Sequence, residues 1–178
     1  GQFLHDIQRV EVLKGPQPTA FGSFAVNGAV NIVSNTARFD EQTFEIGAGV
    51  GSFDEYRING VANLPVTDWL AFRLAAFSVD KDGYSDNVSG ENQNARVGTN
   101  LRFTTSVKTD HFRGDFIIAL EDNDGPGIGF NSKYYRTDGG IADAGSDLDF
   151  GPTNTVIDRE IALYQLKTQF DVTSNLSV

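Results

Sequence analysis

The sequence predicts an all-β protein, a partial transmembrane antiparallel β-barrel with about six strands. Three observations support this prediction. Segments of roughly ten residues alternate between apolar and polar side chains, as the strands of such a barrel do. Short turns alternate with longer loops along most of the chain, which is the asymmetry of membrane-spanning barrels. Glycine and phenylalanine are abundant, with 19 and 14 residues, and helix signals are scarce.

Two short strands are expected before the barrel strands. Residues 9–14 alternate between charged and apolar side chains, which is the pattern of a half-buried strand. Gly15-Pro16 ends this strand, because proline lacks an N–H and glycine tolerates turn geometry. A second strand is expected at 29–33, with Gly28 allowing a bulge or a close backbone approach. On their own, the two strands would fit a hairpin in any β domain.

Six longer strands follow, and each has one apolar and one polar face. The fourth alternates most regularly, whereas the third alternates poorly because Phe77 and Val79 fall on the face of Arg73. A short link at 52–54 breaks the alternation of short turns and long loops, and the last long loop is expected at 123–158. The expected strands are 44–51, 56–64, 69–80, 95–105, 112–122 and 159–173.

The two faces of these strands can be assigned if the sheet lies in a bilayer. Apolar side chains then point toward lipid, and the polar face lines the lumen. Trp69, Tyr56 and Tyr164 are candidates for the aromatic girdles, with ordinary sheet packing as the alternative reading. The charged residues expected to face inward are Arg57, Arg73, Arg96, Arg102, Arg113, Asp115, Glu121, Lys167 and Asp171.

The composition excludes several classes of function. The formal net charge of −10 argues against nucleic acid as a partner. The chain has no cysteine, and its two histidines lie far apart in sequence, so we expect no metal site, no cofactor and no catalytic constellation. No apolar run approaches the length of a transmembrane helix. Because the 178 residues include no methionine and end in what looks like another strand, we expect them to be part of a longer protein.

The long loop is acidic and also rich in aromatic residues. Between Asn123 and Asp158 it carries Asp124, Asp138, Asp143, Asp147, Asp149 and Asp158 against Lys133 and Arg136. Aromatic side chains among polar residues suit ligand capture by stacking and cation–π contact. A loop of this length is equally well explained as a mobile solvated segment, and the sequence does not choose between the two.

The first 35 or so residues carry a recognisable motif. It runs Ile7-Gln8-Arg9-Val10-Glu11-Val12-Leu13-Lys14-Gly15-Pro16, then Phe21-Gly22, then Gly28-Ala29-Val30-Asn31-Ile32-Val33. In residue types and spacing it resembles the end of the plug domain of TonB-dependent outer-membrane receptors. Two positions depart from the pattern: Pro18 stands where the family often has a small residue, and Asn27 replaces the first glycine of a Gly-Gly pair.

This resemblance implies an architecture and a function. Residues 1–38 would be the C-terminal part of the plug domain, and 39–178 the first strands of a barrel in the bacterial outer membrane. The whole protein would not be an enzyme. It would take up a scarce ligand actively, most often a ferric siderophore, with cobalamin, haem or an oligosaccharide as alternatives. Its partners would be outer-membrane lipid and TonB, the latter contacted through a segment upstream of Gly1.

The resemblance also suggests site residues. Arg9, Glu11 and Lys14 would form plug–barrel ion pairs that hold the plug in place. Gly47, Gly49 and Gly51 would be small lumen-facing residues that leave room for the plug. The residues suggested for ligand binding are Phe21, Phe24, Phe130, Tyr134 and Tyr135.

A competing hypothesis is a secreted β-sandwich that binds glycans through its aromatic loop. The two hypotheses differ in where the apolar faces of the strands lie. In a sandwich, residues such as Phe103, Phe116 and Leu166 would pack into a closed core. In a barrel they would form an exposed band.

Overall fold

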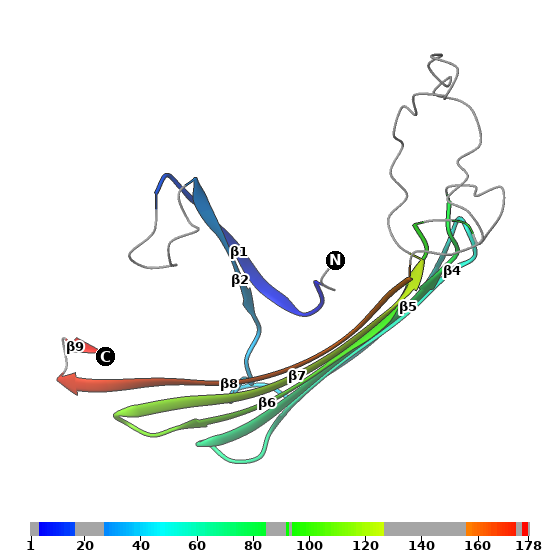
Figure 1. Ribbon diagram of the computed structural model, residues 1–178. Helices are drawn as coiled ribbons and strands as arrows, with labels where there is room; N and C mark the ends of the chain where they lie inside the picture. The colour runs from blue at the N-terminus through cyan, green and yellow to red at the C-terminus, as the bar shows by residue number, and fades with distance from the viewer. Residues whose placement is uncertain are drawn as a thin grey trace, which may run out of the picture.

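The computed structural model is all-β, with two antiparallel sheets and no helix among the residues it describes, which are 4–16, 27–84, 92, 94–126, 156–173 and 176–177. Within those residues, no helix exists that is long and apolar enough to cross a membrane. The smaller sheet is a hairpin that rises above the concave side of the larger, curved sheet (Figure 1).

The hairpin consists of β1 (Ile7–Lys14) and β2 (Gly28–Ser34), paired antiparallel. The expected turn after β1 is confirmed, because Gly15 has a φ of 86°, which favours glycine. The expected close backbone approach at Gly28 is also confirmed: a Cβ there would collide with the carbonyl oxygen of Leu13. Gly15 and Gly28 of the motif therefore each have a structural reason.

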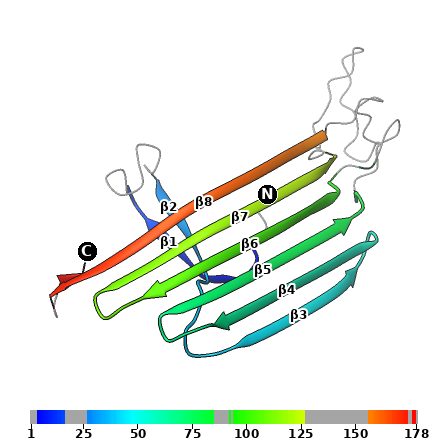
Figure 2. The same cartoon turned by 90° about the horizontal axis from the view of Figure 1, so that it is seen from below.

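The larger sheet is a meander in which each strand pairs with its neighbour in sequence (Figure 2). The predicted fold class and its six long strands are confirmed. The strands are β3 (Thr43–Gly51), β4 (Glu55–Pro65), β5 (Leu70–Lys81), β6 (Arg96–Lys108), β7 (Phe112–Pro126), β8 (Val156–Thr173) and the two-residue β9 (Leu176–Ser177).

Several strands are longer than the sequence predicted. Ser106, expected to begin a turn, lies inside β6, where it is fully buried and its Oγ donates to Asp115 Oδ1 at 2.5 Å. Asp124 and Asp158, assigned to the long loop, pair with each other across β7 and β8. The prediction ended these strands too early because polar residues were taken as loop signals. Ser106 in fact continues the polar inward face, whereas Asp124 and Asp158 lie on the outward face at the loop end of the sheet.

The distribution of buried residues is inverted relative to a water-soluble domain. The buried hydrophobic residues on the concave side of the sheet are small or medium in size, and the largest fully buried side chains are Asn63, Thr104 and Ser106. The opposite face carries large exposed apolar side chains, among them Phe44, Phe116, Leu166 and Phe170. No second sheet covers that face among the described residues, as a β-sandwich would require.

Strand register confirms the predicted inward face. Arg73, Arg102 and Asp115 lie on the same face of the sheet as the other six charged residues assigned to the lumen. Phe77 and Val79, which spoiled the alternation of β5, also lie on this face, where the His5 ring lies 5.7 Å from the Phe77 ring. Contact with the segment before β1 therefore explains the inward position of Phe77.

The three glycines of β3 also face inward. A Cβ at Gly47 would lie 2.8 Å from Asn59 Oδ1, and one at Gly49 would lie 2.5 Å from Arg57 Nε. Among the described residues, side chains of the paired strand β4 therefore lie beside these glycines. That the glycines make room for the plug stays a prediction.

One buried side chain of the larger sheet, which forms the wall below the hairpin, binds the backbone of the link between the two sheets, residues 35–42. Asn63 on β4 is 1% exposed. Its Nδ2 donates to the carbonyl oxygens of Arg38 at 3.0 Å and Glu41 at 2.7 Å, and its Oδ1 accepts from the Arg38 N–H at 2.9 Å. An amide suits this position because it can both donate to and accept from the backbone.

We expect Asn63→Ala to loosen the link in the full-length protein. The change leaves one N–H and two carbonyl groups of the link without their partner, which costs roughly 1–3 kcal/mol. Amide hydrogen exchange should become faster at Arg38, because its backbone N–H donates to Asn63 Oδ1 in the wild type. Asn59→Ala, on the same strand and face, is the control. Equal exchange in the two variants would contradict this role of Asn63.

Candidate functional site

The hairpin is docked on the larger sheet mainly through Asp6, the residue before β1. Asp6 has a φ of 53°, a left-handed conformation that aspartate tolerates better than most residues. Its side chain is only 3% exposed. A carboxylate buried this deeply needs charged or hydrogen-bonding partners, and the inner wall provides them.

Two arginines of adjacent strands hold the Asp6 carboxylate. Arg73 on β5 binds it with both oxygens engaged: Nε donates to Oδ2 at 2.9 Å and Nη2 donates to Oδ1 at 2.6 Å. Arg102 on β6 places its Nη2 3.4 Å from Asp6 Oδ2. The two arginine side chains are 11% and 10% exposed, so the cluster is largely shielded from water. The bidentate geometry makes the Arg73 contact the stronger of the two.

The same cluster also binds the backbone around Asp6. Arg102 Nη2 donates to the carbonyl oxygens of His5 at 2.8 Å and Asp6 at 2.9 Å. From the end of β2, Asn35 Nδ2 donates to Asp6 Oδ1 at 2.7 Å, and the Asn35 N–H donates to the Asp6 carbonyl oxygen at 3.1 Å. One cluster thus closes the base of the hairpin and fixes that base to the wall. We call Asp6, Asn35, Arg73 and Arg102 the Asp6 cluster.

The protonation of Asp6 reflects two opposed effects. Burial raises the pKa of this carboxyl group. Hydrogen bonds from Arg73 and Asn35, with the charges of Arg73 and Arg102, outweigh burial and hold the pKa of Asp6 below its ordinary value of 3.8. Asp6 is therefore charged at neutral pH, which the two buried arginines require.

A second contact lies between the link and the lower ends of β6 and β7. The Lys108 ammonium lies 4.4 Å from the centroid of the Phe39 ring, and the Arg113 guanidinium lies 5.5 Å from the same centroid. Arg113 Nη2 donates to Thr36 Oγ1 at 3.2 Å. These contacts border a hollow of about 500 Å³ between the link and the wall. They hold the link, whereas the Asp6 cluster holds the hairpin.

Two of the three residues proposed for plug–barrel ion pairs, Arg9 and Glu11, pair with each other within the hairpin. Arg9 Nε lies 2.6 Å from Glu11 Oε1 on the same strand, and Asn31 of β2 donates to Glu11 Oε2 at 2.8 Å. The hydrogen bonds from Arg9 and Asn31 hold the pKa of Glu11 below its ordinary value. Lys14 is exposed at the far end of β1. Pairing of these three residues with other barrel strands stays a prediction.

The sequence analysis missed Asp6, although one signal pointed to it. Arg73 faces Asn63 and Thr104 across the neighbouring strands, and Arg102 faces Ala75 and Ala119. Neither arginine therefore has a carboxylate directly opposite in the sheet. Two inward-facing arginines without an acidic cross-strand partner indicate that the counter-charge comes from another segment.

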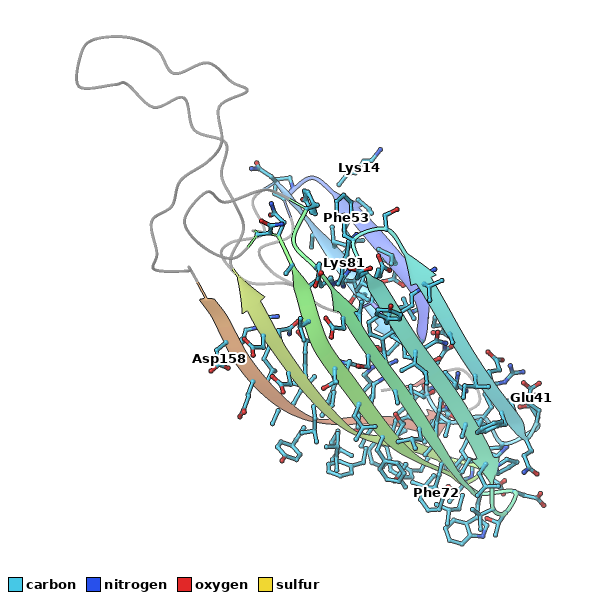
Figure 3. The ribbon with its side chains drawn as sticks, turned by 90° about the vertical axis from the view of Figure 1, so that its right-hand side faces the viewer. Lys14, Glu41, Phe53, Phe72, Lys81 and Asp158 are labelled. Atoms are coloured by element: carbon cyan, nitrogen blue, oxygen red, sulfur yellow. The ribbon has the colours of Figure 1, made fainter. Side chains whose placement is uncertain are left out.

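The proposed ligand-binding residues lie outside the described residues, so their role stays a prediction. They are Phe21, Phe24, Phe130, Tyr134 and Tyr135. At the loop end of the sheet the structure does describe one aromatic pair, Phe53 and Tyr84, whose ring centroids lie 5.9 Å apart. Lys81 lies 5.6 Å from the Phe53 ring, and Figure 3 shows these two residues at the end opposite Glu41 and Phe72. Among the described residues, no group of three or more acidic or histidine side chains could hold a metal ion.

Comparison with known proteins finds partial similarity to bacterial receptors. The chain is 38% identical over 71 residues to the pesticin receptor of Yersinia pestis, and 32% identical over 87 residues to the metal-pseudopaline receptor CntO of Pseudomonas aeruginosa. These matches cover 40% and 48% of this chain, but only 10% and 12% of the relatives. The iron-regulated outer membrane virulence protein of Vibrio cholerae is 23% identical, over 75% of this chain and 26% of the relative.

The chain therefore spans only a small part of the length of the curated relatives it matches. No family model matches the sequence, and no solved structure matches it. The relatives are TonB-dependent outer-membrane receptors, the class that the motif of the first 35 residues resembles. An all-β, inward-polar wall with a docked hairpin agrees with a partial barrel of that class.

We expect Asp6→Asn to weaken docking of the hairpin in the full-length protein. Asparagine tolerates the left-handed backbone and keeps the shape, so the change removes chiefly the charge. Two arginines are then left buried without their counter-ion, at a cost of about 3 kcal/mol. Hydrogen exchange of the β1 amides and the thermal midpoint report the loss. Glu11→Gln, in the exposed pair, is the matched control and should leave both unchanged. If the control loses as much protection as Asp6→Asn, the pair Arg9–Glu11 carries the docking instead.

Docking should also weaken in acid, within a defined pH window. Because the docked Asp6 has a lowered pKa, its contribution to stability is complete above pH 3.8 and is lost as the pH falls through the lower, docked value. Protection of the β1 amides should therefore stay constant from neutral pH down to the ordinary value of 3.8 and decline only below it. In Asp6→Asn this acid transition should be absent. A transition of the wild type near neutral pH would show that another group controls docking.

Proposed function

We propose that the chain contributes the end of the plug and the first barrel strands of a TonB-dependent receptor in the bacterial outer membrane. The observation that carries this proposal is the arrangement of the two sheets. A hairpin with the plug motif is fixed by a buried ion cluster to the polar face of a wall, whose other face is apolar and exposed. A wall of that polarity fits lipid outside and a polar lumen inside.

The proposed activity is energy-driven uptake of a scarce ligand, and a ferric siderophore is the first candidate. Support comes from the relatives, which are named for pesticin, for a metal–pseudopaline complex and for iron regulation. Those names show that ligands vary among receptors of similar sequence. Cobalamin, haem or an oligosaccharide therefore remain the alternatives for this chain. The partners in this proposal are TonB, reached through a segment upstream of Gly1, and outer-membrane lipid.

The Asp6 cluster has a specific role in this proposal. A ligand can cross the barrel only if the plug moves or rearranges, so the contacts between plug and wall must hold at rest and separate when pulled. Among the described residues, the hairpin base is held chiefly by polar contacts, those of the Asp6 carboxylate with Arg73 and Arg102 and of the His5 and Asp6 carbonyl oxygens with Arg102. Water that enters a separating ion cluster can solvate its charges, whereas separated apolar surfaces gain no such compensation.

We expect deletion of the gene that encodes the full-length protein to abolish growth of the source bacterium on one ferric siderophore under iron limitation. Uptake of the ⁵⁵Fe-labelled complex should stop on addition of a proton ionophore, because energy comes from the inner membrane. The wild-type gene should restore uptake. Uptake that persists without energy would instead indicate a passive channel. If the wild-type gene restores uptake of cobalamin but not of a ferric siderophore, the ligand is cobalamin and the assignment as a receptor stands.

A further inference from the structure

Two lysines on the inward face of the wall lie over phenylalanine rings, but only one of them has a carboxylate beside it. At the loop end, Lys81 Nζ lies 5.6 Å from the centroid of the Phe53 ring and 3.3 Å from Glu55 Oε2. At the end with the short turns, the Lys108 ammonium lies over the Phe39 ring, and no carboxylate of the described residues forms an ion pair with it. The wall therefore supplies a counter-charge for Lys81 and none for Lys108.

A second cation shares the Phe39 ring with Lys108. Arg113 pairs with Lys108 across β6 and β7, and its guanidinium contacts the same ring. Salt screens the repulsion between two charges this close only in part, because the screening length is about 8 Å under physiological conditions. Asp115 balances part of the Arg113 charge, since its Oδ2 lies 3.5 Å from Arg113 Nε, while its Oδ1 accepts from Ser106. Together Lys108 and Arg113 thus keep an excess of positive charge.

This excess charge borders the hollow between the link and the wall, which we call the link hollow. Its volume of about 500 Å³ lies within the range of roughly 300–1,000 Å³ that small-molecule sites have. Lys108 and Arg113 line it from the wall, and Arg38 and Asp40 line it from the link. Carboxylates of the link already balance Arg38, with Asp40 at 3.5 Å and Glu41 at 3.3 Å. The unbalanced charge of the link hollow therefore lies on its wall side.

The donors on the wall side are those that bind an oxyanion. The contacts of Arg113 with Asp115 and Thr36 involve Nε and Nη2, so further N–H groups of the guanidinium can donate to a ligand. The Lys108 backbone is fixed, because its N–H donates to the Trp69 carbonyl oxygen at 2.9 Å. A guanidinium beside an ammonium is a donor set that suits carboxylate and phosphate groups.

We propose that Lys108 and Arg113 bind an oxyanion, a carboxylate or a phosphate, in the link hollow. A bound anion reduces the repulsion between the two cations and joins the wall to the link, because both cations also contact Phe39. Two sources can supply this chemistry. One is an aspartate or glutamate upstream of Gly1, which rests on the proposed function because that segment would then be the rest of the plug. The other is a free anion, which does not depend on it.

Carbodiimide cross-linking of the full-length protein tests the first source. The reagent joins an amine to a carboxylate in contact with it, and mass spectrometry locates the product. Lys81 should cross-link to Glu55, which shows that the reagent reaches the inward face. Lys108 should cross-link to an acidic residue upstream of Gly1, and Lys108→Arg should lose this product because arginine does not react. A product of Lys108 with Asp40 alone would overturn the proposal, since the link would then supply the counter-charge itself.

Titration calorimetry with inorganic phosphate at constant ionic strength tests the second source. With a free anion as the occupant, the wild type and Lys108→Arg should bind phosphate alike. Lys108→Gln should bind it at least about tenfold more weakly, as expected for the loss of one charge-assisted contact. Lys81→Gln is the matched control and should bind phosphate as the wild type does, because its lysine already has a carboxylate partner. Equal binding by Lys108→Gln would show an adventitious ion only and would overturn this source.

The two measurements together identify the occupant. A cross-link from Lys108 to the upstream segment identifies a carboxylate of the same protein. Phosphate binding that depends on Lys108, without that cross-link, identifies a free anion. If neither is found while Lys81 still cross-links to Glu55, the link hollow binds no oxyanion and the proposal is overturned. None of these results changes the receptor assignment, which the uptake experiment tests separately.

Discussion

The arrangement of this chain depends on the buried carboxylate of Asp6. Two arginines on the inner wall are almost fully shielded from water, and a charge in such a place destabilises the fold unless an opposite charge lies beside it. Asp6 meets this requirement for both at once, and it does so from outside the sheet. The buried charges of Arg73 and Arg102 therefore have their counter-charge only when the hairpin is docked. The hairpin in turn has its base closed by Asn35 bonding to the same residue.

A second constraint comes from the exposed face of the sheet. With large apolar residues such as Phe44 and Leu166 pointing outward, the inner face is left with small apolar and polar side chains. Contacts on that face are therefore specific hydrogen bonds and ion pairs, with little apolar packing. This explains why a few polar contacts, those of Asp6 for the hairpin and those of Asn63 and Arg113 for the link, carry attachments that a packed core would share among many residues.

Much of the fold could be predicted from the sequence, because the period of two in a strand is a local signal. It identified six long strands, their faces and the inward position of residues such as Arg73 and Arg102. Strand ends were predicted less well, since Ser106 and Asp124 look like loop residues until their partners across the strand are known. The Asp6 cluster could not be derived, because Asp6 lies 67 and 96 positions from its two arginines and no periodicity relates them. The ion pairs expected from the motif concern Arg9, Glu11 and Lys14, and they remain a prediction.

The meander topology has a consequence for the order in which the chain can fold. Each strand of the wall pairs with its neighbour in sequence, so every step closes a hairpin, and those with short turns cost little loop entropy. The contacts of Asp6 with Arg73 and of the Asp6 carbonyl with Arg102 span 67 and 96 residues. The complete site for Asp6 exists only when β5 and β6 are paired, because the two arginines come from different strands. Docking of the hairpin thus requires that β5 and β6 are paired in the correct register. A slip of one residue would turn one arginine to the other face and leave Asp6 with one arginine partner.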